Sequence, residues 1–185
     1  MEQRIVVGIS GGSGAILGIR LLESLRGSVW QTHLVMTETA EELIESETPL
    51  TADEVRELAT VSYDNTDLFA SIASGSFKTA GMVVVPCSMK TLGGIASGYS
   101  DNLLLRAADV CLKERRKVVL VARETPLSLI HIENMGKVTR AGAVVFPPVL
   151  PFYCQPKGID DMVNHIVGRV LDVFGIDNEL YTRWE

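Results

Sequence analysis

The sequence lacks any long run of apolar residues, and it contains few cysteines and histidines. No stretch approaches the roughly 18 uncharged apolar residues that a membrane span requires. The N-terminus shows no charged segment followed by a long apolar one, as a signal peptide would. The three cysteines, Cys87, Cys111 and Cys154, are far apart and odd in number, with no CxxC or Cys/His spacing for zinc. This excludes a self-contained disulfide framework and favours a reducing compartment, so we expect a cytoplasmic protein with no membrane association and no metal site.

The chain is acidic, with a formal net charge of −6 over 185 residues. A nucleic-acid-binding protein would carry a basic face, so we expect no nucleic-acid partner. Phosphorylated small molecules remain open as ligands, because they need only a few local cations and backbone donors. The length fits one domain and no repeat or low-complexity linker divides it, so residues 1–185 are treated as a single domain.

Short apolar runs alternate with stretches of helical period along the whole chain. Strands are expected at Ile5–Ile9, His33–Met36, Gly81–Pro86, Val118–Val121 and Ala143–Phe146, and helices at Ala15–Arg26, Glu38–Ser46, Ala52–Ala59, from about Ser88, at Asn102–Arg115, Pro126–Arg140 and Ile159–Phe174. The run Gly81–Pro86 is apolar throughout, as a strand covered on both faces requires. The alternation predicts an α/β fold, a mostly parallel sheet with helices on both faces.

Ligands of such sheets bind at the carboxyl ends of the strands, near the point where the strand order reverses. Three loops follow buried strands in this way: Ser10–Gly14, Cys87–Thr91 and Arg123–Thr125. We therefore expect the functional residues to concentrate in these loops.

The loop Ser10–Gly14 follows a strand and opens a helix. Its glycines let the backbone approach a ligand closely, and the helix N-terminus offers N–H groups to an anion. The loop matches neither GxGxxG nor the Walker A motif, and a tight turn with no ligand is the alternative. In the second loop Ser88 is placed to cap a helix, which again points N–H groups at the crevice, whereas Cys87 is expected to be a packing residue.

Arg106 and Lys113 lie seven residues apart on one predicted helix, so they differ by only about 20° around its axis. They could form a second anion site, or they could be a solvated face on which Asp109 forms an ion pair. Arg123 and Glu124 directly follow a buried strand, and they could equally be a pair that braces a loop. The three histidines show no ligand spacing and are interpreted as structural or surface residues.

Several motifs occur in the same order as in one known family. They are GISGGSGA near the N-terminus, Pro86-Cys87-Ser88-Met89-Lys90-Thr91, Arg106-Ala107-Ala108-Asp109-Val110 with Leu112-Lys113-Glu114-Arg115-Arg116, Arg123-Glu124-Thr125-Pro126-Leu127, His131-Ile132-Glu133-Asn134-Met135, Pro147-Pro148 with Phe152-Tyr153, and Arg183-Trp184. Over nearly its whole length the chain resembles the flavin prenyltransferases, the UbiX-type proteins formerly described as aromatic-acid decarboxylases.

The resemblance implies a Rossmann-like, flavodoxin-like flavoprotein that is typically a dodecamer with sites at subunit junctions. Such an enzyme transfers a dimethylallyl group from dimethylallyl monophosphate to N5 and C6 of reduced FMN, without a metal, and supplies the product to a UbiD-type decarboxylase. By matching motif, the expected FMN-binding residues are Gly11, Gly12, Ser13, Thr37, Ser88, Met89, Lys90, Thr91 and Arg123. The expected prenyl-phosphate residues are Arg106, Lys113, Glu124, Tyr153 and Arg169, of which Tyr153 and Arg169 would come from a neighbouring subunit.

The resemblance also gives Ser13 and Glu47 a role in proton handling, although Glu47 has no signal of its own in the sequence. One departure stands out, because the residue after Tyr153 is often His in the family and is Cys154 here. No Asp-rich magnesium motif is present, which fits phosphate departure assisted by Arg and Lys. The alternatives are an FMN-dependent cysteine decarboxylase of related fold, whose PASANT-like loop is not found here, and a flavodoxin-like electron carrier without catalysis.

Overall fold

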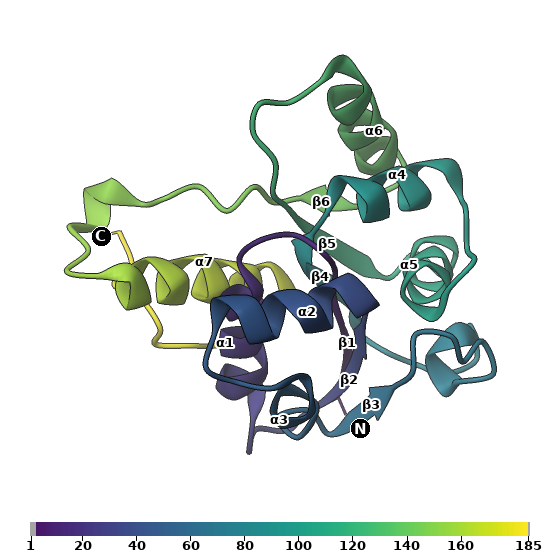
Figure 1. The fold of residues 1–185 in the computed structure, drawn as a ribbon, viewed down its shortest axis with the longest axis horizontal. Coiled ribbons are helices and arrows are strands. Elements are labelled where there is room, and N and C mark those ends of the chain that lie inside the picture. The colour runs from purple at the N-terminus through teal and green to yellow at the C-terminus, as the bar shows by residue number, and fades with distance from the viewer. Residues whose placement is uncertain (1–2, 185) are drawn as a thin grey trace.

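A six-stranded parallel sheet forms the centre of the computed structural model, which describes residues 3–184 (Figure 1). Its strands are β1 (Gln3–Ile9), β2 (Trp30–Met36), β3 (Val61–Tyr63), β4 (Gly81–Cys87), β5 (Lys117–Ala122) and β6 (Val144–Val145), in the spatial order β3-β2-β1-β4-β5-β6. All of the pairings are parallel. The predicted α/β fold is confirmed, and its strand order reverses between β1 and β4.

Helices cover both faces of this sheet. They are α1 (Ala15–Leu25), α2 (Glu38–Glu47), α3 (Ala52–Arg56), α4 (Met89–Ser97), α5 (Leu103–Lys113), α6 (Leu129–Arg140) and α7 (Ile159–Phe174), with 3₁₀ turns at Ser71–Ala73 and Phe152–Cys154. Apolar residues of α1, α2, α3 and α7 form one core, and those of α4, α5 and α6 form the other. Among the described helices, none has both the length and the apolar character needed to cross a membrane.

The buried stretches of β1, β4 and β5 (residues 5–9, 81–87 and 118–122) are apolar throughout because each contributes to both cores. In β1, Ile5 and Val7 belong to the core under α1, whereas Val6 belongs to the core under α5. Successive side chains of a strand point to opposite faces, so a strand covered on both sides needs no polar position. This is why the continuous apolar runs of the sequence located β1, β4 and β5 correctly.

The structure differs from the sequence-based expectation mainly at the edges. The edge strand β3 was not predicted, because it is three residues long, mostly exposed and without an apolar run. Helix α6 begins at Leu129 rather than at Pro126, since Ser128 and His131 form a capping box there. Helix α3 ends at Arg56, three residues before the expected end.

Helix α1 packs closely on the sheet through Gly18. A Cβ atom at this position would lie 2.6 Å from the carbonyl oxygen of Val85 in β4 and within 3.0 Å of the Ile9 side chain. Because the first of these neighbours is backbone, it cannot move aside without displacing the strand. The absence of a side chain at Gly18 therefore sets the distance between α1 and the switch point of the sheet.

We expect Gly18→Ala to lower the free energy of unfolding by about 1–3 kcal/mol, even though alanine is the better helix former. Gly136→Ala in α6 is the matched control, because its added Cβ would make only an ordinary contact, 3.5 Å from the Arg140 side chain. The control should be neutral or stabilising by up to about 1 kcal/mol. Urea unfolding at one fixed protein concentration measures both variants, and equal stabilities would contradict this account of α1 packing.

Candidate functional site

Ser10 ties together the two loops at the switch point of the sheet. Its buried hydroxyl donates to the carbonyl oxygen of Pro86 at 3.0 Å and accepts from the backbone N–H of Ser88 at 2.8 Å. The backbone N–H of Ser10 also donates to the Pro86 carbonyl oxygen, at 3.2 Å. The end of β1 and the end of β4 are thus held side by side, as a site between them requires.

The N-terminus of α1 is occupied by a carboxylate of the chain itself. Gly14, in the left-handed region at φ +105°, places its N–H 2.8 Å from Oε2 of Glu47, and the N–H of Ala15 lies 3.1 Å from the same oxygen. The hydroxyl of Ser13 also bonds to Glu47. The sequence had suggested that these N–H groups were open to a ligand anion, and the structure corrects this because Glu47, the last residue of α2, takes that place.

The electrostatic environment keeps Glu47 ionised. Burial works to raise the pKa of its carboxyl group, but the hydrogen bonds from Gly14, Ser13 and Ala15 and the positive charge of Arg123 together hold that pKa below its usual range. Partial positive charge at a helix N-terminus acts in the same direction. At neutral pH the site therefore contains a carboxylate hydrogen-bonded to a serine hydroxyl, a pair that can accept and relay a proton.

A cavity of about 300 Å³ opens at the carboxyl ends of β1, β2 and β4. Gly11, two residues before Ser13, lines it, and we call it the Ser13–Glu47 cavity after the pair on the adjoining loop, although neither of those side chains is in its lining. Its walls include many of the residues expected to bind FMN. They are Gly11, Thr37, Ser88, Met89, Lys90 and Thr91, together with Glu124 and the unpredicted Thr39, Asn102, Leu104 and Leu105. The structure thus brings together segments that lie far apart in the sequence.

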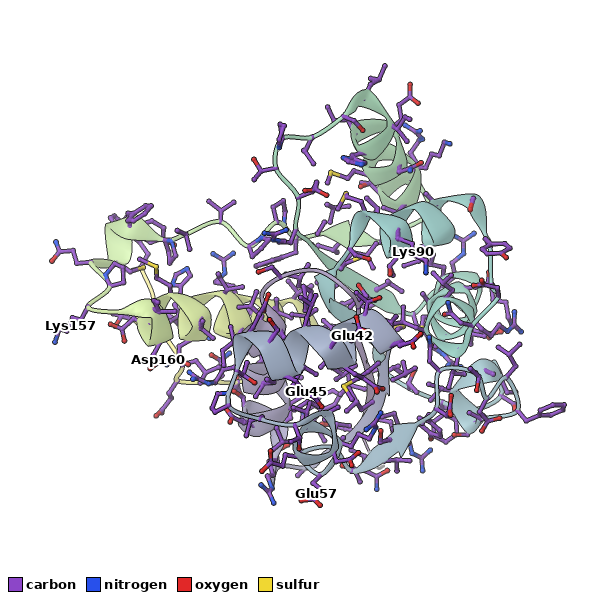
Figure 2. All side chains as sticks on the ribbon, viewed as in Figure 1. Glu42, Glu45, Glu57, Lys90, Lys157 and Asp160 are labelled. Atoms are coloured by element: carbon purple, nitrogen blue, oxygen red, sulfur yellow. The ribbon has the colours of Figure 1, made fainter. Side chains whose placement is uncertain are left out.

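At one wall of the cavity Gly11 lets the Thr39 side chain pack against its backbone, because a Cβ atom there would lie 2.7 Å from that side chain. Another wall, the first turn of α4, fits an anionic ligand such as FMN. Helix α4, capped by Ser88, has no acidic residue in its first turn, which instead contains the positively charged Lys90 (Figure 2). Unlike α1, this helix N-terminus is free to attract a negative group.

Arg123 and Glu124 enter the site from the end of β5. The backbone N–H of Arg123 donates to the carbonyl oxygen of Cys87 at 3.3 Å, which places its side chain near Glu47. Glu124 lines the cavity and accepts a hydrogen bond from the N–H of Thr125 at 3.0 Å. Both residues therefore lie at the site, as their position after a buried strand had indicated.

Arg106 and Lys113 lie on the outer face of α5, away from the cavity lining. Arg106 donates to Asp109 at 2.7 Å and to the carbonyl oxygen of Ala73 at 3.2 Å, and Lys113 pairs with Glu114. The Arg106–Asp109 ion pair, which the sequence left open as an alternative, is thus present. Within one chain these cations do not line the cavity beside Ser13, so a role at that site requires a second subunit.

Tyr153 and Arg169 line another cavity, of about 220 Å³, with Pro147 and His165. This cavity lies where the 3₁₀ turn Phe152–Cys154 meets α7. One side of Tyr153 packs edge-on against Trp184, with ring centroids 5.8 Å apart. The two residues that sequence reasoning assigned to a neighbouring subunit are therefore found together, on a surface apart from the Ser13–Glu47 cavity lining.

Cys87, His33 and His131 have structural surroundings. Burial raises the pKa of the Cys87 thiol to about 12, which agrees with a packing role at the end of β4. His33 bonds to the Tyr63 hydroxyl at 2.8 Å, and His131 accepts from the Ser128 N–H at 3.2 Å. Within residues 3–184 no group of three or more His, Cys, Asp or Glu side chains could hold a metal ion.

Sequence reasoning missed several residues of the site. Ser10 carried a usable signal, since it is a polar residue directly after a buried strand. Asn102 did too, because its side chain caps the helix that was expected to start there, accepting from the Leu105 N–H at 3.0 Å. Thr39 and Leu104 had none, because only the packing of α2 and α5 around the cavity brings them in.

The comparisons with known proteins agree with this geometry. The family model described as "Flavoprotein" matches residues 1–171. The flavin prenyltransferase UbiX of Escherichia coli strain K12 is 52% identical, over 99% of this chain and 98% of its own. The structure of AnUbiX (PadA1), a complex with FMN and dimethylallyl pyrophosphate, superposes with a TM-score of 0.99 at 52% identity and covers 100% of this chain and 98% of that one.

A second solved structure is the dodecameric FMN-dependent UbiX-like decarboxylase of Escherichia coli O157:H7. It has a TM-score of 0.97 and 51% identity, and the match covers 99% of this chain and all of that one. The peptidyl-cysteine decarboxylase EpiD, a member of the rival class, is only 16% identical, with a TM-score of 0.62 over 82% of this chain and 84% of that one, and this shows a shared fold alone. With half of its residues shared with UbiX proteins over nearly its full length, this chain belongs to the UbiX-like flavin prenyltransferases of the flavoprotein family.

Proposed function

We propose that this chain transfers a dimethylallyl group from dimethylallyl monophosphate to N5 and C6 of reduced FMN, closing a fourth ring. The observation that carries the proposal is the Ser13–Glu47 pair beside a glycine-lined cavity in a chain of the flavin prenyltransferase family. An electron carrier would need the cavity but not an ionised carboxylate held against a serine at its edge. The family match likewise favours prenyl transfer over cysteine decarboxylation.

In this proposal FMN occupies the 300 Å³ cavity. Gly11, Thr37 and the first turn of α4, residues 88–91, line the cavity and would contact FMN, and Gly12 belongs to the same loop as Gly11. Ser13 and Arg123 are not in the lining of this cavity within one chain, and we place them at the flavin from their position beside Glu47. Reduced FMN supplies the nucleophilic N5 and C6 atoms, and the protein supplies position and charge.

The carbon–oxygen bond of the prenyl phosphate breaks as the dimethylallyl carbon is transferred, and the phosphate leaves with the bonding electrons. Arg106, Lys113, Arg169 and the hydroxyl of Tyr153 would stabilise that departing anion, with Glu124 orienting the cations. Preorganised donors in a site that excludes water suit this step and require no metal. AnUbiX (PadA1) was solved with the pyrophosphate ester, so the choice of the monophosphate is part of our proposal.

Bond formation at N5 and C6 releases one proton from each atom. Closure onto C6 uses up the C=C double bond of the prenyl group, whose other carbon takes up one proton, and the second proton leaves with the phosphate. The Ser13–Glu47 pair is placed to take and return a proton in these steps. The Ser13 hydroxyl already bonds to the carboxylate, so a proton accepted by Ser13 can pass to Glu47. Glu47 is unprotonated at neutral pH and can accept the proton, and because its lowered pKa makes it a weak base, it can pass the proton on. Positioning and electrostatics then provide the rate, without a covalent protein nucleophile.

The residues proposed to hold the prenyl phosphate lie on two different surfaces of one chain: Arg106 and Lys113 on α5, and Tyr153 and Arg169 at the second cavity. We explain this separation by the assembly of several subunits. We propose a homo-oligomer, a dodecamer as in the UbiX-like protein of Escherichia coli O157:H7, in which neighbouring subunits bring these surfaces to the Ser13–Glu47 cavity. We further propose a cytoplasmic location, in keeping with three unpaired cysteines, and a UbiD-type decarboxylase as the user of the product.

Incubation with reduced FMN and dimethylallyl monophosphate should give a flavin whose mass is larger by one five-carbon prenyl unit, with release of inorganic phosphate. EDTA should leave the yield unchanged, because the proposed charge stabilisation comes from side chains. Mass spectrometry of the extracted flavin measures the product. Unmodified flavin after complete reduction would contradict the proposed function.

Glu47→Gln should slow single-turnover prenylation about a hundredfold or more, since glutamine keeps the shape of the side chain but cannot accept a proton. Glu45→Gln on the exposed side of the same helix is the matched control and should retain the wild-type rate (Figure 2). Flavin content, read by absorbance, checks that both variants still bind FMN. A near-normal rate in Glu47→Gln would remove this residue from proton transfer.

A further inference from the structure

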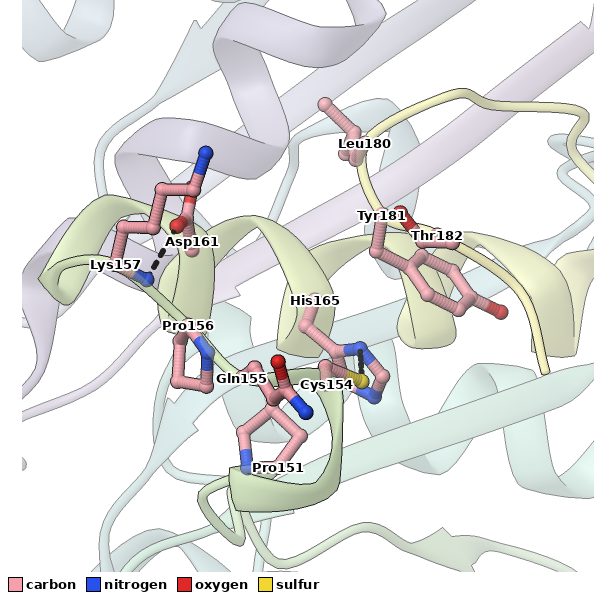
Figure 3. Close-up of a pocket in the computed structure, with 10 residues that line it drawn as sticks. All are labelled: Pro151, Cys154, Gln155, Pro156, Lys157, Asp161, His165, Leu180, Tyr181 and Thr182. Carbon is pink, nitrogen blue, oxygen red and sulfur yellow. Dashed lines mark hydrogen bonds between the residues drawn. The ribbon is translucent and has the colours of Figure 1, made fainter.

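His165 lies between two side chains of the 3₁₀ turn Phe152–Cys154 and contacts both. Its Nε2 atom is 3.2 Å from the hydroxyl oxygen of Tyr153, and its Nδ1 atom is 3.4 Å from the sulfur of Cys154. Figure 3 shows the contact with Cys154 at the wall of a cavity of about 230 Å³. Cys154, His165 and Tyr153 therefore form a continuous row of groups that can exchange hydrogen bonds.

The imidazole of His165 is fixed in place. It is 6% exposed on α7, and the Tyr181 ring packs edge-on against it with centroids 4.5 Å apart. Burial and the nearby charge of Arg169 lower the pKa of His165, against the opposing effect of Asp172. A neutral ring in a fixed position carries a single N–H, so only one of its two contacts can receive that proton.

Two arrangements of the protons are possible in this row. In the first, the Cys154 thiol donates to Nδ1 and the Nε2–H donates to the Tyr153 oxygen, which leaves the Tyr153 hydroxyl hydrogen free. In the second, the Tyr153 hydroxyl donates to Nε2 and the Nδ1–H points at the sulfur. In the first arrangement every donor has a good acceptor: the thiol donates to nitrogen, the ring N–H to the Tyr153 oxygen, and the hydroxyl of the exposed Tyr153 to water or a ligand. In the second, the ring N–H meets only sulfur, which is a weak acceptor, so a thiol at position 154 favours the first arrangement.

The difference matters for the cavity that Tyr153 and Arg169 share. In the first arrangement the Tyr153 hydroxyl can donate to a phosphate oxygen beside the guanidinium of Arg169. The hydrogens of Cys154, His165 and Tyr153 then all point in the direction from Cys154 towards the phosphate. In the second arrangement the tyrosine offers only lone pairs to the anion. Charge-assisted hydrogen bonds are the stronger ones, so the arrangement that frees this donor is the one that favours binding of the phosphate.

We propose that Cys154 is a positioning residue that sets the tautomer of His165 and so presents the Tyr153 hydroxyl as a donor to the prenyl phosphate. The inference rests on the proposed function, in which Tyr153 and Arg169 hold that phosphate. It gives a role to the residue at which this chain departs from the histidine often found in the family. It also explains why the buried imidazole of His165, in the middle of α7, has a polar partner at each ring nitrogen, Tyr153 and Cys154.

The test is a double-mutant cycle on binding of dimethylallyl monophosphate to the FMN-loaded oligomer, measured by calorimetry. Cys154→Ala should weaken binding about fivefold, the usual size of one lost hydrogen bond, whereas Cys154→Ser keeps a donor but adds a better acceptor for Nδ1–H and should lose less than Cys154→Ala. In a Tyr153→Phe background Cys154→Ala should have no further effect, because the hydroxyl on which it acts is gone. A merely structural role for Cys154 would instead give the same loss in both backgrounds, and that result would overturn the inference.

A second measurement does not depend on activity or on phosphate binding. Nitrogen-15 spectra of the sedimented, histidine-labelled protein report the tautomer of His165, assigned by its absence in His165→Gln. The inference predicts Nε2–H in the wild type and a shift towards Nδ1–H in Cys154→Ala. Nδ1–H in the wild type would overturn it, whereas a wild type that shows Nε2–H but binds no prenyl phosphate would count against the proposed function alone.

Discussion

The carboxylate of Glu47 on the N-terminus of α1 is the interaction on which the rest of the site depends. It joins the last residue of α2 to the loop after β1, and so fixes the second βα unit against the first. It also satisfies N–H groups that would otherwise attract an anion. Because Glu47 fills the N-terminus of α1, the helix N-terminus that remains open to a phosphate or flavin is that of α4, which follows the neighbouring strand β4.

The same interaction explains how Glu47 can be both structural and reactive. A carboxylate that accepts two backbone N–H groups and a serine hydroxyl has a lowered pKa, so it stays ionised at neutral pH and readily releases a proton that it has accepted. Its position does not depend on ligand, because the bonds that hold it belong to the fold. The cations proposed to meet the departing phosphate are arranged differently, since their partners within one chain are Asp109, Glu114 and Asp172.

Much of the fold could be predicted from the sequence because its strands are buried on both faces. A continuous apolar run such as Gly81–Pro86 has few alternatives, and the polar or glycine-rich residues that follow such runs mark the carboxyl edge of the sheet. The loop glycines, Ser88 and Arg123 were placed at the site for this reason. Strand β3 was missed because a short, exposed edge strand leaves no such pattern.

Other parts of the site were beyond sequence reasoning because they depend on tertiary contacts. Glu47 is 33 positions from Gly14, and nothing near it in the sequence indicates that it caps another helix. Helical spacing put Arg106 and Lys113 on one face, but it could not show that this face looks away from the cavity of the same chain. The row formed by Cys154, His165 and Tyr153 likewise needs the fold of the chain over α7.

The central claim is that the Ser13–Glu47 cavity of one chain works with the Tyr153–Arg169 surface of another. It is tested most directly by mixing inactive Ser13→Ala subunits with inactive Tyr153→Phe subunits, dissociating and reassembling them, and measuring prenylated flavin. Sites that draw their two halves from different chains would include some with both halves intact, so the mixture should regain roughly a quarter of the wild-type activity. If the mixture stays as inactive as its two components, both halves of the site come from the same chain and the account is wrong.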